Sequence, residues 1–169
     1  MKRSVGFWQF IGFLFVSVGG VLLHYLFDWS EQSKIVAAFS GINESIWEHM
    51  KLLYFPLAWF AVFEYFVLGK RNDFWCIKLL GILIGISAIP IIYYFYNGAI
   101  GKSPDWLNIT IFFIAAFLAL FTEYILFTKE KIKACNKAVA IFTICFIGVL
   151  FIIFSYKAPD LLIFKDPTV

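Results

Sequence analysis

The side chains best suited to chemistry in this sequence lie in one stretch, residues 43–51, which reads Asn-Glu-Ser-Ile-Trp-Glu-His-Met-Lys. The chain has two histidines: His49 lies in this stretch, and His24 lies near the end of the apolar run before it. Imidazole and carboxylate groups bind metal ions, and imidazole exchanges protons near neutral pH. The pattern therefore indicates a polar binding site. Its predicted members are His24, Asn43, Glu44, Glu48, His49 and Lys51.

The same stretch is typical of a loop that turns into a helix. Asn43 is a good N-cap, and Glu44 in the first turn suits the positive end of the helix dipole. Helical spacing then places Glu44, Glu48 and Lys51 on one face. A purely structural interpretation is that Glu48 pairs with Lys51 while the other polar groups lie at the membrane surface. That interpretation leaves His24 unexplained, since antiparallel helices would bring both histidines to a similar depth.

Several functions are compatible with such a site. The leading hypothesis is small-solute or ion handling, coupled to protons, through an external His/Glu site. A second is a metal-dependent hydrolase or transferase acting on a lipid, with a divalent metal bound by His24, Glu48 and His49. Axial ligation of a haem by the two histidines and a non-catalytic membrane partner subunit are further alternatives. The sequence does not decide whether the chain is an enzyme, and it identifies no catalytic residue.

Two more carboxylates, Glu64 and Glu123, lie inside apolar runs, five or six residues from basic clusters. Acidic groups in such positions extend to the interface or pair with nearby cations, here Lys70, Arg71 or Lys129. Alternatively, they belong to a polar pathway leading inward from the outer site. If the two acids face each other, one of them is expected to hold a proton at neutral pH.

The elements that must position these groups are membrane helices. The 169 residues are 62% hydrophobic and 15% charged, whereas a soluble domain is about half apolar and about a quarter charged. Crossing the hydrocarbon core takes about 20 apolar residues in a helix, and backbone groups in lipid must be paired internally. Five runs qualify, at residues 7–27, 52–69, 79–96, 107–127 and 138–156.

We therefore expect an all-α polytopic membrane bundle of about five helices in a single transmembrane domain, residues 1–169. Residues 28–51 form an external segment, and Pro56 separates an external amphipathic half-helix from the second span. Gly81 and Gly85 form a G-x-x-x-G spacing that lets a neighbouring helix approach closely. The small lumen of five helices favours a homo-oligomer or a second membrane subunit for any transport.

Lysine and arginine between the spans predict the orientation. The five basic residues expected on the outer side are Lys34, Lys51, Lys102, Lys157 and Lys165. The nine on the other side are Lys2, Arg3, Lys70, Arg71, Lys78, Lys129, Lys131, Lys133 and Lys137. The N-terminus is therefore expected in the cytoplasm and the C-terminus outside. On this topology the three cysteines lie in the membrane or on the reducing side, as free thiols, and a net charge of +3 gives no reason to expect a nucleic-acid partner.

A resemblance supports the membrane assignment. The sequence resembles a family of small bacterial multi-pass membrane proteins known only as a domain of unknown function, over roughly the first 70 residues. The resemblance implies a bacterial inner membrane location but no activity, ligand or cofactor. The residues that carry it are His24, Asp28-Trp29, Asn43-Glu44-Ser45, Trp47-Glu48-His49, Lys51 and Glu64-Tyr65.

Overall fold

The structure is a computed structural model that describes residues 2–101, 104–129, 132 and 134–167. These residues form six α-helices and a short 3-10 helix, and no strand occurs among them. The elements are α1 (Lys2–Trp29), α2 (Lys34–Ala37), α3 (Ile46–Leu68), α4 (Phe74–Ala99), α5 (Asp105–Thr128), α6 (Lys137–Tyr156) and η1 (Leu162–Phe164).

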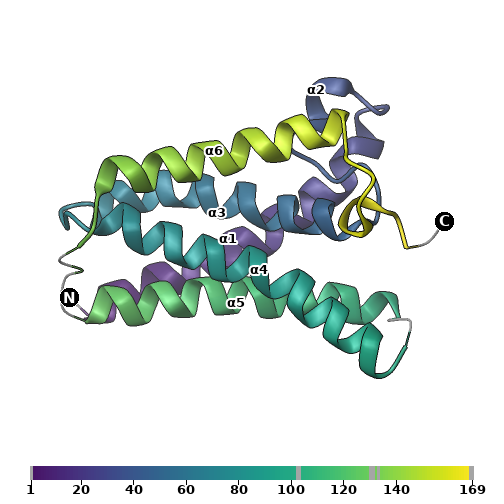
Figure 1. The fold of residues 1–169 in the computed structure, drawn as a ribbon. Coiled ribbons are helices and arrows are strands. Elements are labelled where there is room, and N and C mark those ends of the chain that lie inside the picture. The colour runs from purple at the N-terminus through teal and green to yellow at the C-terminus, as the bar shows by residue number, and fades with distance from the viewer. Residues whose placement is uncertain (1, 102–103, 130–131, 133, 168–169) are drawn as a thin grey trace.

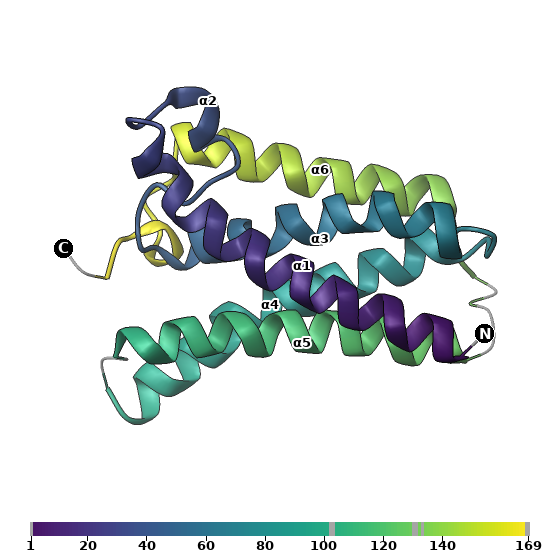
Figure 2. The same cartoon turned by 180° about the vertical axis from the view of Figure 1, so that it is seen from behind.

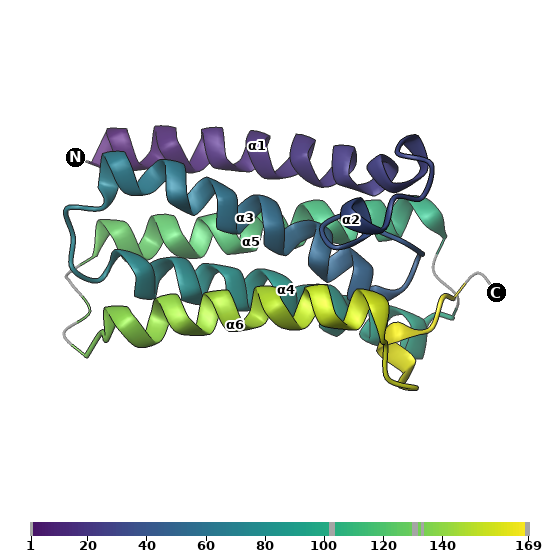
Figure 3. The same cartoon turned by 90° about the horizontal axis from the view of Figure 1, so that it is seen from above.

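All the helices except α2 and η1 are long and apolar enough to cross a membrane, which confirms the predicted five spans. Helices α1, α3, α4 and α5 close a ring in which each contacts two neighbours, and α6 lies against α3 and α4 (Figure 3). The two termini lie at opposite ends of the bundle, as an odd number of spans requires (Figure 1). This is the architecture of a multi-pass membrane protein.

The second span begins earlier than its hydropathy suggests. Helix α3 starts at Ile46 rather than at residue 52 and continues through Pro56 without a break. The segment predicted as an external half-helix therefore forms the first turns of α3. Its side chains Ile46, Glu48 and Lys51 are buried in the bundle because they pair or pack inside it, which a hydropathy window cannot detect.

The middle of the bundle is apolar and tightly packed. Val16, Leu53 and Ala115 are fully buried, whereas Phe residues cover the outer surface, including Phe66 and Phe142. Apolar side chains that face outward suit lipid. Gly81 and Gly85 both face α5. A Cβ added at Gly85 would lie 2.9 Å from the Cβ of Ala119, so the two helices approach closely here. The packing role predicted for this spacing is confirmed.

The expectation of free cysteines is wrong for two of the three. Cys76, at the start of α4, and Cys135, in the connection before α6, form a disulfide, and Cys145 is a free exposed thiol. The two residues are 59 positions apart in sequence, without a recognisable spacing motif. They become neighbours only because the start of α4 and the connection between α5 and α6 lie at the same end of the bundle.

Candidate functional site

The loop before α3 places Glu44 outside the helix. The N-cap is Ser45 and not Asn43 as predicted: Ser45 Oγ accepts the Glu48 backbone N–H at 3.3 Å. Asn43 Oδ1 instead accepts the Ser45 N–H at 2.9 Å and so fixes the turn that precedes the helix. The Ser45-x-x-Glu48 spacing, a capping-box sequence, is the signal that would have found this boundary. Because α3 begins after Ser45, Glu44 lies in the loop and not in the first turn of the helix.

Three predicted site residues converge from three separate segments. His24 comes from the last turns of α1, Glu44 from the loop, and His49 from the first turn of α3, all at the end of the bundle that carries the C-terminus (Figure 2). Glu44 Oε1 lies 3.5 Å from His24 Nε2, and its Oε2 lies 3.6 Å from His49 Nε2. The two imidazole centroids are 6.0 Å apart. One carboxylate thus lies between two imidazoles.

His49 faces Glu44 with its Nε2 atom, and the hydrogen bond made by its other nitrogen shows whether Nε2 carries a proton in the neutral ring. His49 Nδ1 lies 2.9 Å from the Ser45 carbonyl oxygen, which only accepts, so Nδ1 carries a proton. In the neutral ring Nε2 is then an acceptor, and it faces a carboxylate oxygen. His49 Nε2 and Glu44 Oε2 would then be two acceptors facing each other. This arrangement is stabilised by a proton on Nε2, or by a hydrogen-bond donor or cation that binds both atoms.

These residues line a cavity of about 490 Å³. Its walls come from α1, the start of α3 and the start of α5, with Pro167 of the C-terminal tail at its edge. Leu52, Ile109 and Phe112 are among the apolar lining residues, and Asn108 and Tyr25 add polar groups. The volume is within the range of small-molecule sites in proteins, about 300–1,000 Å³.

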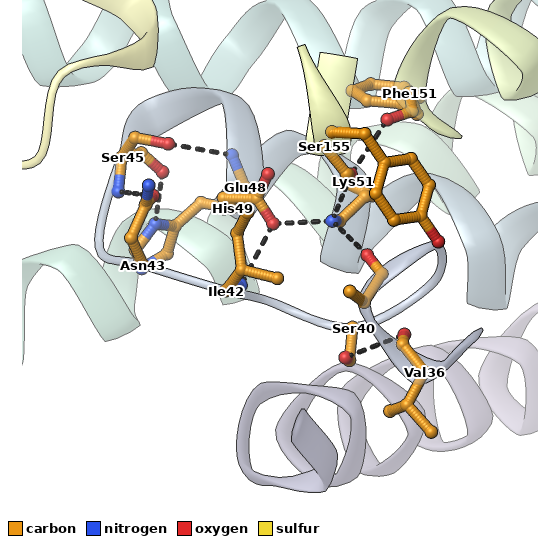
Figure 4. A network of polar contacts seen from close by, with 12 residues as sticks. Val36, Ser40, Ile42, Asn43, Ser45, Glu48, His49, Lys51, Phe151 and Ser155 are labelled. Atoms are coloured by element: carbon orange, nitrogen blue, oxygen red, sulfur yellow. Dashed lines mark hydrogen bonds and ion pairs between the residues drawn. The ribbon is translucent and has the colours of Figure 1, made fainter. Parts of the chain in front are cut away.

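Glu48 and Lys51 lie in a separate network behind the cavity. Glu48 Oε2 and Lys51 Nζ are 2.5 Å apart, and both side chains are almost fully buried (Figure 4). Lys51 also donates to the Ala37 carbonyl at 3.0 Å and to Ser155 Oγ at 2.6 Å, while the Ile42 N–H donates to Glu48. The predicted Glu48–Lys51 pair therefore exists, and it joins the loop and α6 to α3.

Of the three predicted metal ligands, His24 and His49 lie close together, and Glu48 lies apart from them. Glu48 is bound to Lys51, whereas His24 and His49 face Glu44. Across the described parts of the chain, no group of three His, Cys, Asp or Glu side chains has the arrangement of a metal site. The carboxylate of Glu44 also occupies the position between the imidazoles that a haem iron would need.

A second polar cluster, toward the opposite end of the bundle, contains Glu64 and Glu123. Both carboxylates contact Lys78, which was assigned to a cytoplasmic loop from sequence. That assignment is wrong: Lys78 lies inside α4 and is fully buried, and Glu64 and Glu123 do not extend to the interface. The signal was available, because apolar residues flank Lys78 on both sides, and ionisable groups in such positions face the bundle interior.

Comparison with known proteins identifies the family. The profile described as "Family of unknown function (DUF6512)" matches residues 2–169. The chain belongs to this family. The match extends over both polar clusters, whereas the sequence motifs alone covered only about the first 70 residues. No match was found among curated proteins or among solved structures, so membership of the family brings no activity with it.

Proposed function

We propose that this chain is a small-solute or ion-handling membrane protein whose outer pocket, made by His24, Glu44 and His49, binds a small organic cation. The observation that carries the proposal is the pair of facing acceptors. His49 Nε2 and Glu44 Oε2 lie 3.6 Å apart while His49 Nδ1 donates to a carbonyl, so a positively charged donor between them would satisfy both.

The remaining lining supports a cation with an apolar part. Phe112 and Phe113 present aromatic rings in the pocket, and aromatic faces attract ammonium groups. Val21, Leu52 and Ile109 supply aliphatic wall. Glu44 remains partly exposed, with 45% of its side chain accessible, so a ligand can reach it from the membrane surface.

The two imidazoles provide the coupling to protons. A proton on His24 or His49 would place positive charge next to Glu44 and compete with a bound cation. Because the proton and the cation compete for the same acceptors, cation affinity should weaken as the pH is lowered. Proton release on binding is the corresponding expectation at constant pH.

The test is a thermal-stability panel on protein purified into lipid nanodiscs. The probes are butylamine, choline and tetramethylammonium, with Na⁺, K⁺ and Zn²⁺ chlorides for comparison. We expect a saturable stabilisation by at least one organic cation that is lost in Glu44→Gln. The matched control is Glu31→Gln, which removes an exposed carboxylate at the same end of the bundle and should leave the response unchanged.

Two results would overturn the proposal. One is a panel in which no organic cation gives a response that depends on Glu44. The other is stabilisation by Zn²⁺ alone, lost in His24→Ala and His49→Ala, which would favour a metal site and the enzyme hypothesis. Uptake of the binding cation into proteoliposomes would then separate handling of a solute from binding alone.

A further inference from the structure

The second polar cluster, called the inner cluster from here on, is formed by Glu64, Lys78, Glu123 and Gln9. It lies near the end of the bundle that carries the N-terminus and most of the basic residues, which we call the basic end. Lys78 Nζ of α4 lies 2.5 Å from Glu64 Oε2 of α3 and 2.5 Å from Glu123 Oε2 of α5. Gln9 of α1 donates to Glu64 Oε1 at 2.7 Å. The side chains of Glu64, Lys78 and Glu123 have no accessible surface.

Charge counting shows that the cluster is not balanced. With both carboxylates ionised, two negative charges face one ammonium, which leaves one negative charge buried inside the bundle. An isolated buried charge is among the most unfavourable arrangements in a protein, and in practice a group in that position binds a proton instead. One more positive charge is therefore needed at this position.

Two buried atoms identify where that charge is missing. Glu123 Oε1 and Gln9 Oε1 are both buried without a hydrogen-bond partner, and Gln9 is 6% exposed. An amide carries a donor on one side and an acceptor on the other, so a rotated Gln9 can accept from a protonated carboxyl as readily as it donates to an ionised one.

Among the side chains that the structure describes, the groups that surround the cluster add no further charge to it. Helix α3 contributes Glu64, α4 contributes Lys78, α5 contributes Glu123, and α1 contributes the uncharged Gln9. On α6, Lys137 places its Nζ 5.7 Å from the Tyr65 ring centroid rather than beside a carboxylate. Arg71 and Asp73, in the connection between α3 and α4, pair with each other.

We propose that Glu64, Lys78 and Glu123, with Gln9, form a proton-binding site inside the membrane that holds one proton at neutral pH, on the unpartnered oxygen of Glu123. Lys78 lies four residues from the start of α4 and Glu64 four residues from the end of α3. At 1.5 Å per residue the site is roughly 6 Å, measured along the helices, from the basic end of the bundle. This inference does not depend on the outer pocket.

Infrared spectroscopy of the full chain in nanodiscs tests this directly, because a protonated carboxylic acid has a C=O stretching band that a carboxylate lacks. The number of protonated acids should equal the carboxylates minus the ammonium groups. Wild type should show one such band at neutral pH, and both Glu123→Gln and Glu64→Gln should show none, since each leaves a balanced pair. Lys78→Met should double the band, and Glu31→Gln should leave it unchanged.

The outcomes are distinguishable even if Lys78→Met does not fold. Wild type without the band would overturn the proposal, as would a band of full size in both glutamine variants. A sodium-dependent rise in thermal stability, lost in Glu123→Gln and without any carboxylic-acid band, would show that a metal cation supplies the charge and would also overturn it.

Discussion

At the scale of single residues, Glu48 and Lys51 determine where the pocket residues lie although neither lines the pocket. Their ion pair is buried, and its further hydrogen bonds hold the backbone at Ile42 and Ala37 and the hydroxyl of Ser155. The loop between Ile42 and the helix start carries Glu44. The position of Glu44 between the imidazoles therefore depends on the Glu48–Lys51 pair, which lies outside the pocket.

Removing one partner of this pair should be costly. Lys51→Met leaves the Glu48 carboxylate buried without its counter-ion, and breaking buried pairs in this way costs roughly 3–5 kcal/mol. We expect a large fall in the thermal unfolding midpoint for Lys51→Met and for Glu48→Gln, and a smaller one for the double variant, which removes both charges. Equal losses in all three proteins would contradict the account.

At the other end of the bundle, the Asp73 carboxyl should make the folding stability depend on pH. Its carboxylate accepts two hydrogen bonds from Arg71, at 2.9 and 2.7 Å, and one from the Ile132 N–H at 2.8 Å. The Arg71 hydrogen bonds are the main cause that lowers the pKa of Asp73 below its ordinary value of 3.8. A carboxyl with a lowered folded-state pKa stabilises fully above its unfolded value and loses that contribution as the pH falls through the folded value.

The corresponding experiment compares wild type with Asp73→Asn across acidic pH. The variant should be less stable at neutral pH, and the difference in unfolding midpoint should close as the pH is taken below about 4. Because the asparagine side chain does not titrate, the change must come from wild type losing stability. A difference that stays constant down to pH 3 would show that Asp73 acts through packing alone.

At the scale of elements, the close approach of α4 and α5 depends on Gly85. A Cβ at this position would lie 2.9 Å from Ala119 Cβ and 3.3 Å from the Ala115 carbonyl oxygen. Overpacking of this kind costs roughly 1–3 kcal/mol, so Gly85→Ala should lower the unfolding midpoint. Gly98→Ala, in the same helix with open space around it, should be neutral or slightly stabilising. Similar effects in both variants would rule out the packing explanation.

The elements themselves could be predicted from sequence because span length and apolarity depend on local composition alone. The helix start at Ser45 was missed since Asn43 and Ser45 are both good caps, although the Ser45-x-x-Glu48 spacing favours Ser45. Lys78 was misplaced although its flanks are apolar, and its pairing with Glu64 and Glu123 could not be predicted because these partners are on two other helices. His24 and His49 were expected at a similar depth because antiparallel helices fix depth, whereas the 6.0 Å separation of their rings depends on which helix faces meet.

At the scale of the whole molecule, the two polar clusters are separated by apolar packing. His49 and Glu64 are fifteen residues apart on α3, which corresponds to about 22 Å along the helix. Leu53, Leu57 and Ala61 are almost fully buried between them. On α3, therefore, the side chains packed between the outer pocket and the inner cluster are mainly apolar.

Orientation in the membrane is the remaining large-scale expectation. Lys51 and Lys78 are buried, so neither is a topology signal, and the basic residues become eight at the N-terminal end against four at the other end. Lys102, Lys131 and Lys133 in that count lie outside the described residues. The bias still predicts a cytoplasmic N-terminus. The Cys76–Cys135 disulfide lies at the same basic end, whereas disulfides are typical of oxidising compartments.

Cysteine labelling in intact cells decides between these two signals. In a background with Cys76, Cys135 and Cys145 replaced by alanine, a membrane-impermeant maleimide should label Asp160→Cys, which is highly exposed at the C-terminal end. Lys70→Cys, exposed at the basic end, should be labelled only after the membrane is permeabilised. The reverse pattern would place the disulfide outside the cytoplasm and the pocket of His24, Glu44 and His49 on the cytoplasmic face. The pocket would then take its ligand from the opposite side to that expected from charge.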